Sequence, residues 1–192
     1  FNGRTTGTPL CAVILNKDTH SQDYKKTSSI LRPGHADFTG RVKYHNFNDY
    51  RGGGHFSGRL TAPLVFAGAL CRKILEKRGI IIGSRIESIG KIRDESFFDI
   101  VSVKKETLLD FSKDSFPVLD KTCGDRMKES ILKSKEEGDS LGGIIETIVI
   151  NLPAGIGDPF FDSVESTLSH LLFSVPAVKG VEFGEGFNIA CL

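Results

Sequence analysis

The sequence predicts a mixed α/β (α+β) fold, because apolar runs rich in strand-forming residues alternate along the chain with segments of helical periodicity. Hydrophobic residues make up 39% of the 192 residues, which is enough to build a buried core. A chain of this length forms one domain, or a large part of one, by default, so we expect residues 1–192 to be a single domain.

The first half of the chain predicts one strand, one long loop and one helix. Pro9–Asn16 is a short apolar run, typical of a buried strand. Residues 32–54 contain five glycines and no sustained period, so we expect a loop there, with a short strand or turn at Arg41–Asn46. Thr61–Arg78 is the clearest helix, because apolar residues recur at steps of three and four, a proline stands in its first turn, and Gly79 follows its end.

The sequence after residue 79 predicts three strands and two helices. The strands are expected at Ile80–Ile92, Gly142–Leu152 and Val178–Phe183, and the helices at Arg126–Glu137 and Asp162–Val175. Gly83 and Gly90 are expected to make turns within the first of these strands. Residues 94–119 show no clean period, and we interpret the wider stretch 94–126 as a loop or variable insertion.

Composition excludes several classes of protein. The formal net charge of +1 leaves no excess of basic residues for nonspecific binding to nucleic acid. No apolar run reaches the length of about 18 residues that a membrane span needs, so we expect no membrane partner. The N-terminus lacks the basic start and apolar core of a signal peptide, and it opens with Phe1 instead of methionine, which indicates a fragment or a trimmed product.

The four cysteines, Cys11, Cys71, Cys123 and Cys191, are widely scattered and form no Cys-x-x-Cys pair. Disulfides are arithmetically possible, but a chain of this size with an adequate core does not need them. We therefore expect free thiols in a reducing cytoplasm. No two cysteines or histidines have ligand spacing on one element, so we expect no metal site.

The segment from Arg32 to Arg59 carries the clearest functional signal. It combines arginines, histidines and a run of three glycines just before the helix expected at Thr61–Arg78. Glycines let backbone N–H groups approach a ligand, arginines suit phosphates and carboxylates, and a histidine can exchange a proton near neutral pH. The N-terminus of the helix adds a dipole that favours negative charge. These residue types predict a site for an anionic, phosphorylated ligand with an acid–base residue beside it.

The order of the residues in this segment resembles one family, the chorismate synthases. Ser57-x-Arg59 closes a block in which three pieces follow one another at that family's spacing: Arg32-Pro-Gly-His-Ala-Asp37, Lys43-Tyr44 and Asp49-Tyr-Arg-Gly-Gly-Gly54. Further pieces agree in the family's order: Gly3-Arg-Thr-Thr-Gly-Thr-Pro9, Asn16-Lys-Asp18, Ser21-Gln-Asp-Tyr24, Glu136-Glu-Gly-Asp-Ser140, Pro153-Ala-Gly-Ile-Gly157 and Ala177-Val-Lys-Gly-Val-Glu-Phe-Gly184. The resemblance covers nearly the whole chain and is weakest from Asp94 to Arg126.

The resemblance implies a fold, a reaction and partners. The fold is the β-α-β sandwich core of the chorismate synthase type, and the full-length protein is a cytoplasmic homotetramer. The reaction is the anti-1,4 elimination of phosphate from 5-enolpyruvylshikimate 3-phosphate, which gives chorismate in the shikimate pathway and requires reduced FMN without net redox change. NADPH is the reductant where the host makes its own reduced flavin. The implied partners are this small-molecule substrate and the flavin, with no nucleic acid and no membrane.

Residue by residue, the resemblance assigns the charged side chains. His35 matches the histidine of the family's Arg-Pro-Gly-His motif, which implies a catalytic acid beside the flavin. The alternative is a purely structural role, with the ring fixed by hydrogen bonds within the loop. Arg32 and Arg59 match arginines that contact anionic groups of the substrate, although either one alone could be a surface ion pair. Arg51 either serves the same substrate pocket or braces the loop.

Flavin-contacting stretches of the family match His55, Phe56 and Ser57, and also Pro176 with Ala177. The commoner pattern has an arginine and a serine where this chain has His55 and Phe56. The exchange removes a guanidinium and would let Phe56 pack on a ring instead. Pro176 and Ala177 fit a plain helix stop equally well.

Three aspartates border the same region. We expect Asp37 and Asp49 to orient arginines or cap loops more than to act as bases. Asp18 is a weaker candidate for the flavin side of the site.

Two motifs of the family are absent from the chain: Gly-Glu-Ser-His-Gly, with a second catalytic histidine, and Arg-His-Asp-Pro, with an aspartate. We therefore expect the chain to be the central portion of a chorismate synthase and, by itself, a poor catalyst or none. The alternative hypothesis is a non-catalytic domain that binds flavin or phosphate through the same loop. A phosphoryl-handling enzyme is disfavoured because the glycine run lacks the Gly-Lys-Ser/Thr ending of a P-loop. Both absent motifs flanking this sequence in the parent gene would favour the lyase.

Overall fold

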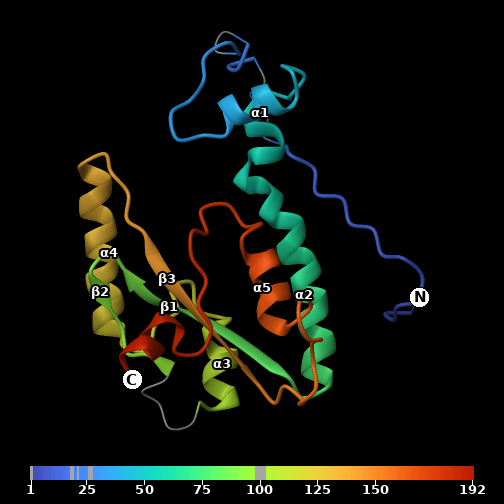
Figure 1. Ribbon diagram of the computed structural model, residues 1–192, viewed down its shortest axis with the longest axis vertical. Coiled ribbons are helices and arrows are strands. Elements are labelled where there is room, and N and C mark those ends of the chain that lie inside the picture. Colours follow the sequence, from blue (N-terminus) through green and yellow to red (C-terminus); the bar gives the residue numbers. More distant parts are fainter. Residues whose placement is uncertain (1, 18–19, 21, 26–27, 98–102) are drawn as a thin grey trace. The chain divides into compact units, whose positions relative to one another are not determined.

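The structure, a computed structural model, describes residues 2–17, 20, 22–25, 28–97 and 103–192. It is an α+β fold of helices and one small antiparallel sheet, as the sequence predicts (Figure 1). The chain divides into two compact units, one of residues 1–68 with 155–192 and one of residues 69–154. The longest helix, α2 (Thr61–Lys77), begins in the first unit and ends in the second. The predicted helix at this position is confirmed.

The sheet lies in the second unit and has three strands in the order β2-β1-β3. Strand β1 (Ile81–Ile89) turns at Gly90 into the short β2 (Ile92–Arg93), and it pairs along its length with β3 (Gly143–Ile150), both antiparallel. The predictions of a first strand, a turn at Gly90 and a strand over residues 142–152 are confirmed.

The predicted turn at Gly83 is wrong, because this glycine lies inside β1 for a packing reason. A Cβ built on Gly83 would lie 2.7 Å from Cδ2 of Leu108, on helix α3 (Lys105–Phe111). Leu108 is fully buried in a cluster with Ile81, Phe97 and Phe111. The missing side chain at position 83 lets α3 approach the strand, so the glycine marks a close contact and not a turn.

Helix α4 (Lys121–Glu136) begins five residues before the predicted start. Its N-cap is Asp120, whose carboxylate accepts the backbone N–H of Thr122 at 2.9 Å. The helix buries Met127 with Val118 and Cys123 in a second cluster. The region that we expected to be a loop or insertion thus supplies a helix, α3, and several core side chains.

A buried ionic network ties this unit together. Arg85 of β1 is fully buried and contacts Asp94 at 3.1 Å and Glu146 of β3 at 2.6 Å. Asp94 also accepts the backbone N–H of Leu119 at 2.6 Å and of Asp120 at 3.1 Å. The network therefore joins two strands of the sheet to the start of α4.

Among its described residues, the first unit contains five further short helices. They are α1 (Asp37–Lys43), two 3-10 helices η1 (Arg51–Phe56) and η2 (Gly58–Leu60) that lead into α2, and α5 (Val164–Leu172), followed by η4 (Gly186–Cys191) near the C-terminus. The predicted helix at 162–175 is confirmed in its central part. Ser163 caps its start, because Ser163 Oγ accepts the backbone N–H of Ser166 at 3.2 Å. At Arg41–Asn46, α1 takes the first residues and a turn forms over the rest, with His45 and Asn46 at positive φ.

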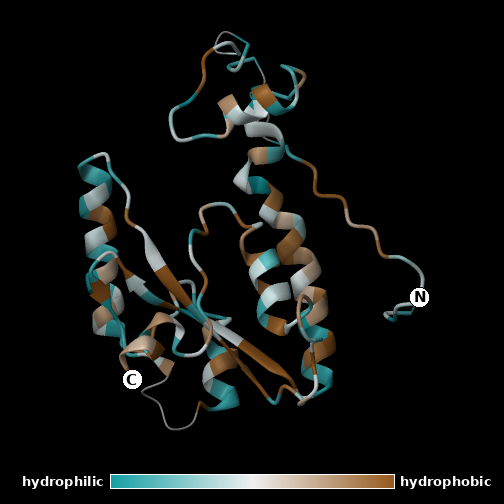
Figure 2. Ribbon diagram, viewed as in Figure 1, coloured by the Kyte–Doolittle hydropathy of each residue, from teal (hydrophilic) through white to brown (hydrophobic). Residues whose placement is uncertain are grey.

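Two predicted strands are wrong. Pro9–Asn16 and Val178–Phe183 have no regular structure, and neither pairs with any of the three strands. The first of these segments is hydrophobic in Figure 2, yet Leu10 and Ile14 are 66% and 59% exposed. An apolar run becomes a strand only where a sheet edge receives it, and sequence composition does not identify that edge.

The four cysteines are free thiols, as expected. Cys123 is buried, and this burial raises the pKa of its thiol. Among the described residues, no helix combines the length and the apolar character needed to cross a membrane.

Candidate active site

The loop that carries His35 is a tight turn leading into α1. Gly34 adopts a left-handed φ of 70°, and the backbone N–H of His35 donates to the carbonyl of Arg32 at 3.3 Å. Asp37 follows as the first residue of α1. The turn brings the side chains of Arg32 and His35 to the same carboxylate.

Asp37 accepts from both of these side chains. Arg32 donates to it from Nε and from Nη2, each at 2.8 Å, and from its backbone N–H at 3.0 Å. His35 Nδ1 lies 2.7 Å from Oδ1 of the same carboxylate. The Arg32 guanidinium is the main reason why the pKa of Asp37 lies well below its usual range. Asp37 is therefore ionised at neutral pH, and it orients both neighbours.

The glycine run passes directly against these side chains. Gly52, Gly53 and Gly54 have φ values of 62°, 94° and 50°, which side chains of L-residues rarely tolerate. A Cβ built on Gly53 would lie 3.2 Å from His35 Nε2, and a Cβ on Gly52 would lie 3.2 Å from Arg59 Nη1. The structure thus brings His35, the glycine run and Arg59 together, as the sequence predicts for an anion site.

Arg51 is paired within its own loop. Its Nε and Nη2 donate to the two carboxylate oxygens of Asp49, each at 2.9 Å, and its backbone N–H donates to Asp49 Oδ1 at 3.0 Å. This pair lowers the pKa of Asp49 from 3.8 to about 2. The geometry is that of a loop brace, which was one of the two roles open for Arg51.

Arg59 differs from the other two arginines. Its side chain is exposed, and among the described residues its guanidinium has neither an ion pair nor a side-chain hydrogen bond. The charges of Arg32 and Arg51 are compensated by Asp37 and Asp49, whereas Arg59 pairs with no carboxylate in the described part of the chain. Arg59 is accordingly the arginine of the site best able to pair with an anionic ligand.

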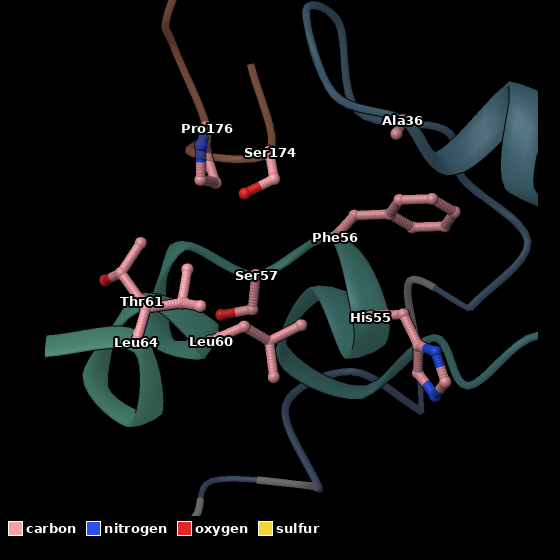
Figure 3. Close-up of a pocket in the computed structure, with 9 residues that line it drawn as sticks. All are labelled: Ala36, His55, Phe56, Ser57, Leu60, Thr61, Leu64, Ser174 and Pro176. Carbon is pink, nitrogen blue, oxygen red and sulfur yellow. The ribbon is translucent and has the colours of Figure 1, made fainter. Parts of the chain in front are cut away.

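A cavity of about 300 Å³ lies beside the glycine run. Figure 3 shows its lining residues: Ala36, His55, Phe56, Ser57, Leu60, Thr61, Leu64, Ser174 and Pro176. Apolar side chains predominate, with three hydroxyl groups among them. This composition is typical of a site for a mainly apolar ligand that also carries hydrogen-bonding groups.

The three hydroxyl groups have complementary capacities. Ser57 Oγ accepts the backbone N–H of Arg59 at 3.2 Å, which leaves its own proton available to donate. The hydroxyls of Thr61 and Ser174 donate to the carbonyls of Gly58 and Leu171, at 2.7 and 2.6 Å, so they remain available as acceptors. The cavity can therefore bind a ligand that has both donors and acceptors.

The predicted flavin-contacting residues occupy different places. The lining of the cavity includes His55, Phe56, Ser57 and Pro176, whereas Ala177, at a positive φ of 71°, is not part of it. The imidazole of His55 is turned away from Ser174 and Pro176 in Figure 3. Asp18 lies outside the described residues.

Phe56 is directed toward Ala36 (Figure 3) and packs on α1. A Cβ built on Gly40 would fall 2.5 Å from the ring of Phe56, and the ring centroid of Tyr44 lies 6.4 Å from it. Five further residues line the cavity and were not predicted from the sequence: Ala36, Leu60, Thr61, Leu64 and Ser174. Each of them lies close in sequence to His35, Ser57 or Pro176, which was the signal available.

The chorismate synthase family model matches residues 1–192, the whole of the chain. The chain belongs to the chorismate synthase family. The expectation drawn from the Arg-Pro-Gly-His and Gly-Gly-Gly pieces is therefore confirmed at the level of the family.

Curated relatives and a solved structure agree with this assignment. Chorismate synthases of Dehalococcoides mccartyi and Pyrococcus abyssi are 46% and 45% identical over 192 and 191 residues, which are 100% and 99% of this chain and 51% of each relative. A crystal structure of chorismate synthase superimposes with a TM-score of 0.65 at 32% identity, covering 80% of this chain and 48% of that one. The fold is therefore of the chorismate synthase type, and the chain spans about half the length of the curated relatives it matches.

Proposed function

We propose that this chain forms part of the active site of a chorismate synthase, a lyase that converts 5-enolpyruvylshikimate 3-phosphate to chorismate by anti-1,4 elimination of phosphate. The observation that carries the proposal is the placement of His35 Nε2 and the uncompensated Arg59 against one glycine run. An acid–base group and an anion-binding group that contact neighbouring glycines of one loop suit a substrate with a phosphate and carboxylates.

The arginines bind and orient the substrate. Arg59 pairs with an anionic group because it has no carboxylate of its own among the described residues. Arg32 keeps guanidinium hydrogen-bonding capacity beyond its two bonds to Asp37, and so offers a second, weaker contact. Arg51 was expected either to serve the substrate pocket or to brace the loop, and its pairing with Asp49 supports the second of these roles.

His35 holds the proton of the site at Nε2. Its imidazole is 26% exposed, and Nε2 faces Gly53, which has no side chain of its own. A general acid must lie within hydrogen-bond reach of the atom that it protonates, and the glycine run permits this approach. The hypothesis that His35 is a catalytic acid is therefore supported over that of a ring held only by loop hydrogen bonds.

Reduced FMN is the cofactor that the family implies, and the cavity suits part of it. An isoalloxazine ring is flat and largely apolar, and it carries carbonyl acceptors and an N–H donor. Ser57 would donate to such a ring, Thr61 and Ser174 would accept from it, and Leu60 and Pro176 would contact its apolar surface. When bound, reduced flavin supplies transient electron density to the reaction without net oxidation.

The remaining features of the family complete the proposal. The active enzyme is a cytoplasmic homotetramer, and its catalytic set includes the second histidine and the aspartate of the two motifs absent from this chain. NADPH serves as reductant if the host enzyme reduces its own flavin. The binding partners are small molecules, with neither nucleic acid nor membrane among them.

The test is a turnover assay with the full-length protein, 5-enolpyruvylshikimate 3-phosphate and reduced FMN under anaerobic conditions. We expect chorismate and phosphate in equal amounts, and no product with oxidised FMN in the absence of a reductant. FMN binding without chorismate formation would favour the alternative, a non-catalytic flavin-binding domain.

A titration of FMN into this chain, followed by flavin fluorescence, tests the cavity separately. Binding that tightens in the presence of the substrate would indicate that flavin and substrate share one site within residues 1–192. Equal affinity with and without the substrate would contradict a coupled site in this chain.

A further inference from the structure

Asp37 and Asp49 have the same pattern of hydrogen bonds from an arginine, but they differ in one further contact. Each carboxylate receives two guanidinium N–H bonds and one backbone N–H from the same arginine, Arg32 for Asp37 and Arg51 for Asp49. Only Asp37 also contacts a histidine ring, at 2.7 Å from His35 Nδ1. A loop brace does not require this additional contact, as Asp49 demonstrates.

The distances determine which ring nitrogen carries the proton in neutral His35. Nδ1 lies 2.7 Å from an oxygen of Asp37 and 3.3 Å from Nη2 of Arg32. If Nδ1 presented a lone pair, it would face an ionised oxygen at short range, which is repulsive. A proton on Nδ1 turns the same contact into a charge-assisted hydrogen bond, worth roughly twice a neutral one. The geometry therefore favours the Nδ1–H form.

The other nitrogen, Nε2, is then the exchangeable one. The bond that one ring nitrogen makes fixes the protonation of the other. Nε2 points at Gly53, where a Cβ would stand only 3.2 Å away, and so faces the backbone that the proposed substrate approaches.

We propose that Asp37 is a positioning residue for His35, holding a proton on Nδ1 so that Nε2 is the atom that delivers and regains the catalytic proton. The inference rests on the proposed function for the reaction itself. It adds a residue that acts through His35 and touches neither substrate nor flavin.

Arg32 supports this arrangement from the other side of the carboxylate. The Asp37 side chain is 18% exposed, and the guanidinium of Arg32 donates to both of its oxygens. With Arg32 beside it, the pKa of Asp37 remains well below its usual range. The carboxylate therefore stays ionised and keeps accepting from His35 across the neutral pH range.

The first test determines which ring nitrogen of His35 carries the proton. We would label the histidines of the full-length protein with ¹⁵N and identify the proton position in neutral His35 by long-range ¹H–¹⁵N NMR, in the native protein, in Asp37→Asn and in Asp49→Asn. We expect the Nδ1–H form in the native protein and in Asp49→Asn. In Asp37→Asn the Nε2–H form should gain population, because an amide can donate to Nδ1. A native protein with the proton on Nε2 would overturn the proposal without any need for a folded variant.

The second test measures kcat and KM of variants at position 37. Asp37→Asn should lower kcat by about 10- to 100-fold, a part of the 10²–10⁴-fold that a positioned acid–base group supplies. KM should change less than kcat, since an effect through Arg32 alone would appear in KM. Asp37→Glu, which keeps a carboxylate, should recover part of the loss. In a His35→Ala background Asp37→Asn should have no further effect on kcat, and an equal further loss would overturn the inference. A native protein that shows the expected ring form but makes no chorismate would contradict the proposed function instead.

Discussion

A Cβ atom built on Gly53 would lie 3.2 Å from Nε2 of His35. The position of the His35 ring therefore leaves little room for a side chain at position 53. Gly53 is buried and has a φ of 94°, which combines backbone strain with steric conflict for any other residue. The access of His35 to a ligand therefore depends on a residue with no side chain.

Gly53→Ala should disturb both the loop and the histidine. An L-residue with positive φ costs roughly 1–2 kcal/mol, and the new methyl group would displace the imidazole from its position. We expect a lower urea midpoint and a reduced kcat. Gly58→Ala is the matched control, because Gly58 lacks a positive φ and a Cβ there meets nothing within 4 Å. If the two variants unfolded at the same urea concentration, the close contact at position 53 would be in doubt.

Arg59→Ala should weaken substrate binding without weakening the fold. The guanidinium has no partner among the described residues, so its removal leaves no carboxylate unpaired. We expect KM for 5-enolpyruvylshikimate 3-phosphate to rise, by about tenfold for each 1.4 kcal/mol of lost binding energy, while the thermal midpoint stays unchanged. Arg78→Ala, at an exposed arginine just after α2, controls for a general loss of positive charge. An unchanged KM in Arg59→Ala would count against a substrate-binding role.

Stability should fall as the pH is lowered from about 4 to about 2. The pKa of Asp49 is lowered to about 2, mainly by its hydrogen bonds from Arg51, and that of Asp37 is lowered by Arg32. Between the usual carboxyl pKa and the lowered value, the unfolded chain binds protons that the folded chain does not, so acid favours unfolding. The stabilisation is complete above the unfolded pKa and is lost as the pH falls through the folded one.

Urea unfolding at a series of pH values measures this dependence. The native protein should show a free energy of unfolding that declines through the acid range. Asp49→Asn should show a shallower decline, since one of the carboxyl groups with a lowered pKa no longer titrates. Identical slopes in the two proteins would mean that the Asp49–Arg51 pair is not formed in solution.

The buried network in the second unit should dominate the stability of the sheet. Replacing Arg85 with leucine leaves Asp94 and Glu146 without their buried counter-charge. Breaking a buried ion pair from one side costs about 3–5 kcal/mol. Lys113→Ala, which breaks an exposed pair with Asp110, should cost no more than about 1 kcal/mol. Denaturant unfolding of the two variants compares these costs, and a small effect of Arg85→Leu would show that water reaches the network.

Local sequence signals predicted the elements that depend on local chemistry. Helix α2 has its proline and its glycine at the expected ends, and β3 is an uninterrupted apolar run. Gly83 was misread because a glycine required by the packing of Leu108 looks like a turn glycine in sequence. Pro9–Asn16 was misread because a strand also requires a partner strand, and composition does not identify that partner.

The candidate site was predicted where its residues are contiguous in sequence. Arg32, His35, the glycine run and Arg59 all lie within residues 32–59, and they come together as expected. The contact between Asp37 and the histidine ring depends on the turn at Gly34, whose conformation the sequence does not specify. The network of Arg85, Asp94 and Glu146 joins residues up to 61 positions apart and left no local signal.

The central claim is that His35 supplies the catalytic proton, and kcat for chorismate formation by His35→Ala tests it most directly. His170→Ala is the matched control, because His170 is an exposed histidine on α5 outside the proposed site. We predict that His35→Ala lowers kcat by a factor of roughly 10–10⁴, the range expected for loss of a general acid–base group. FMN affinity should change little in either variant, and His170→Ala should turn over normally. Normal turnover by His35→Ala would contradict the account.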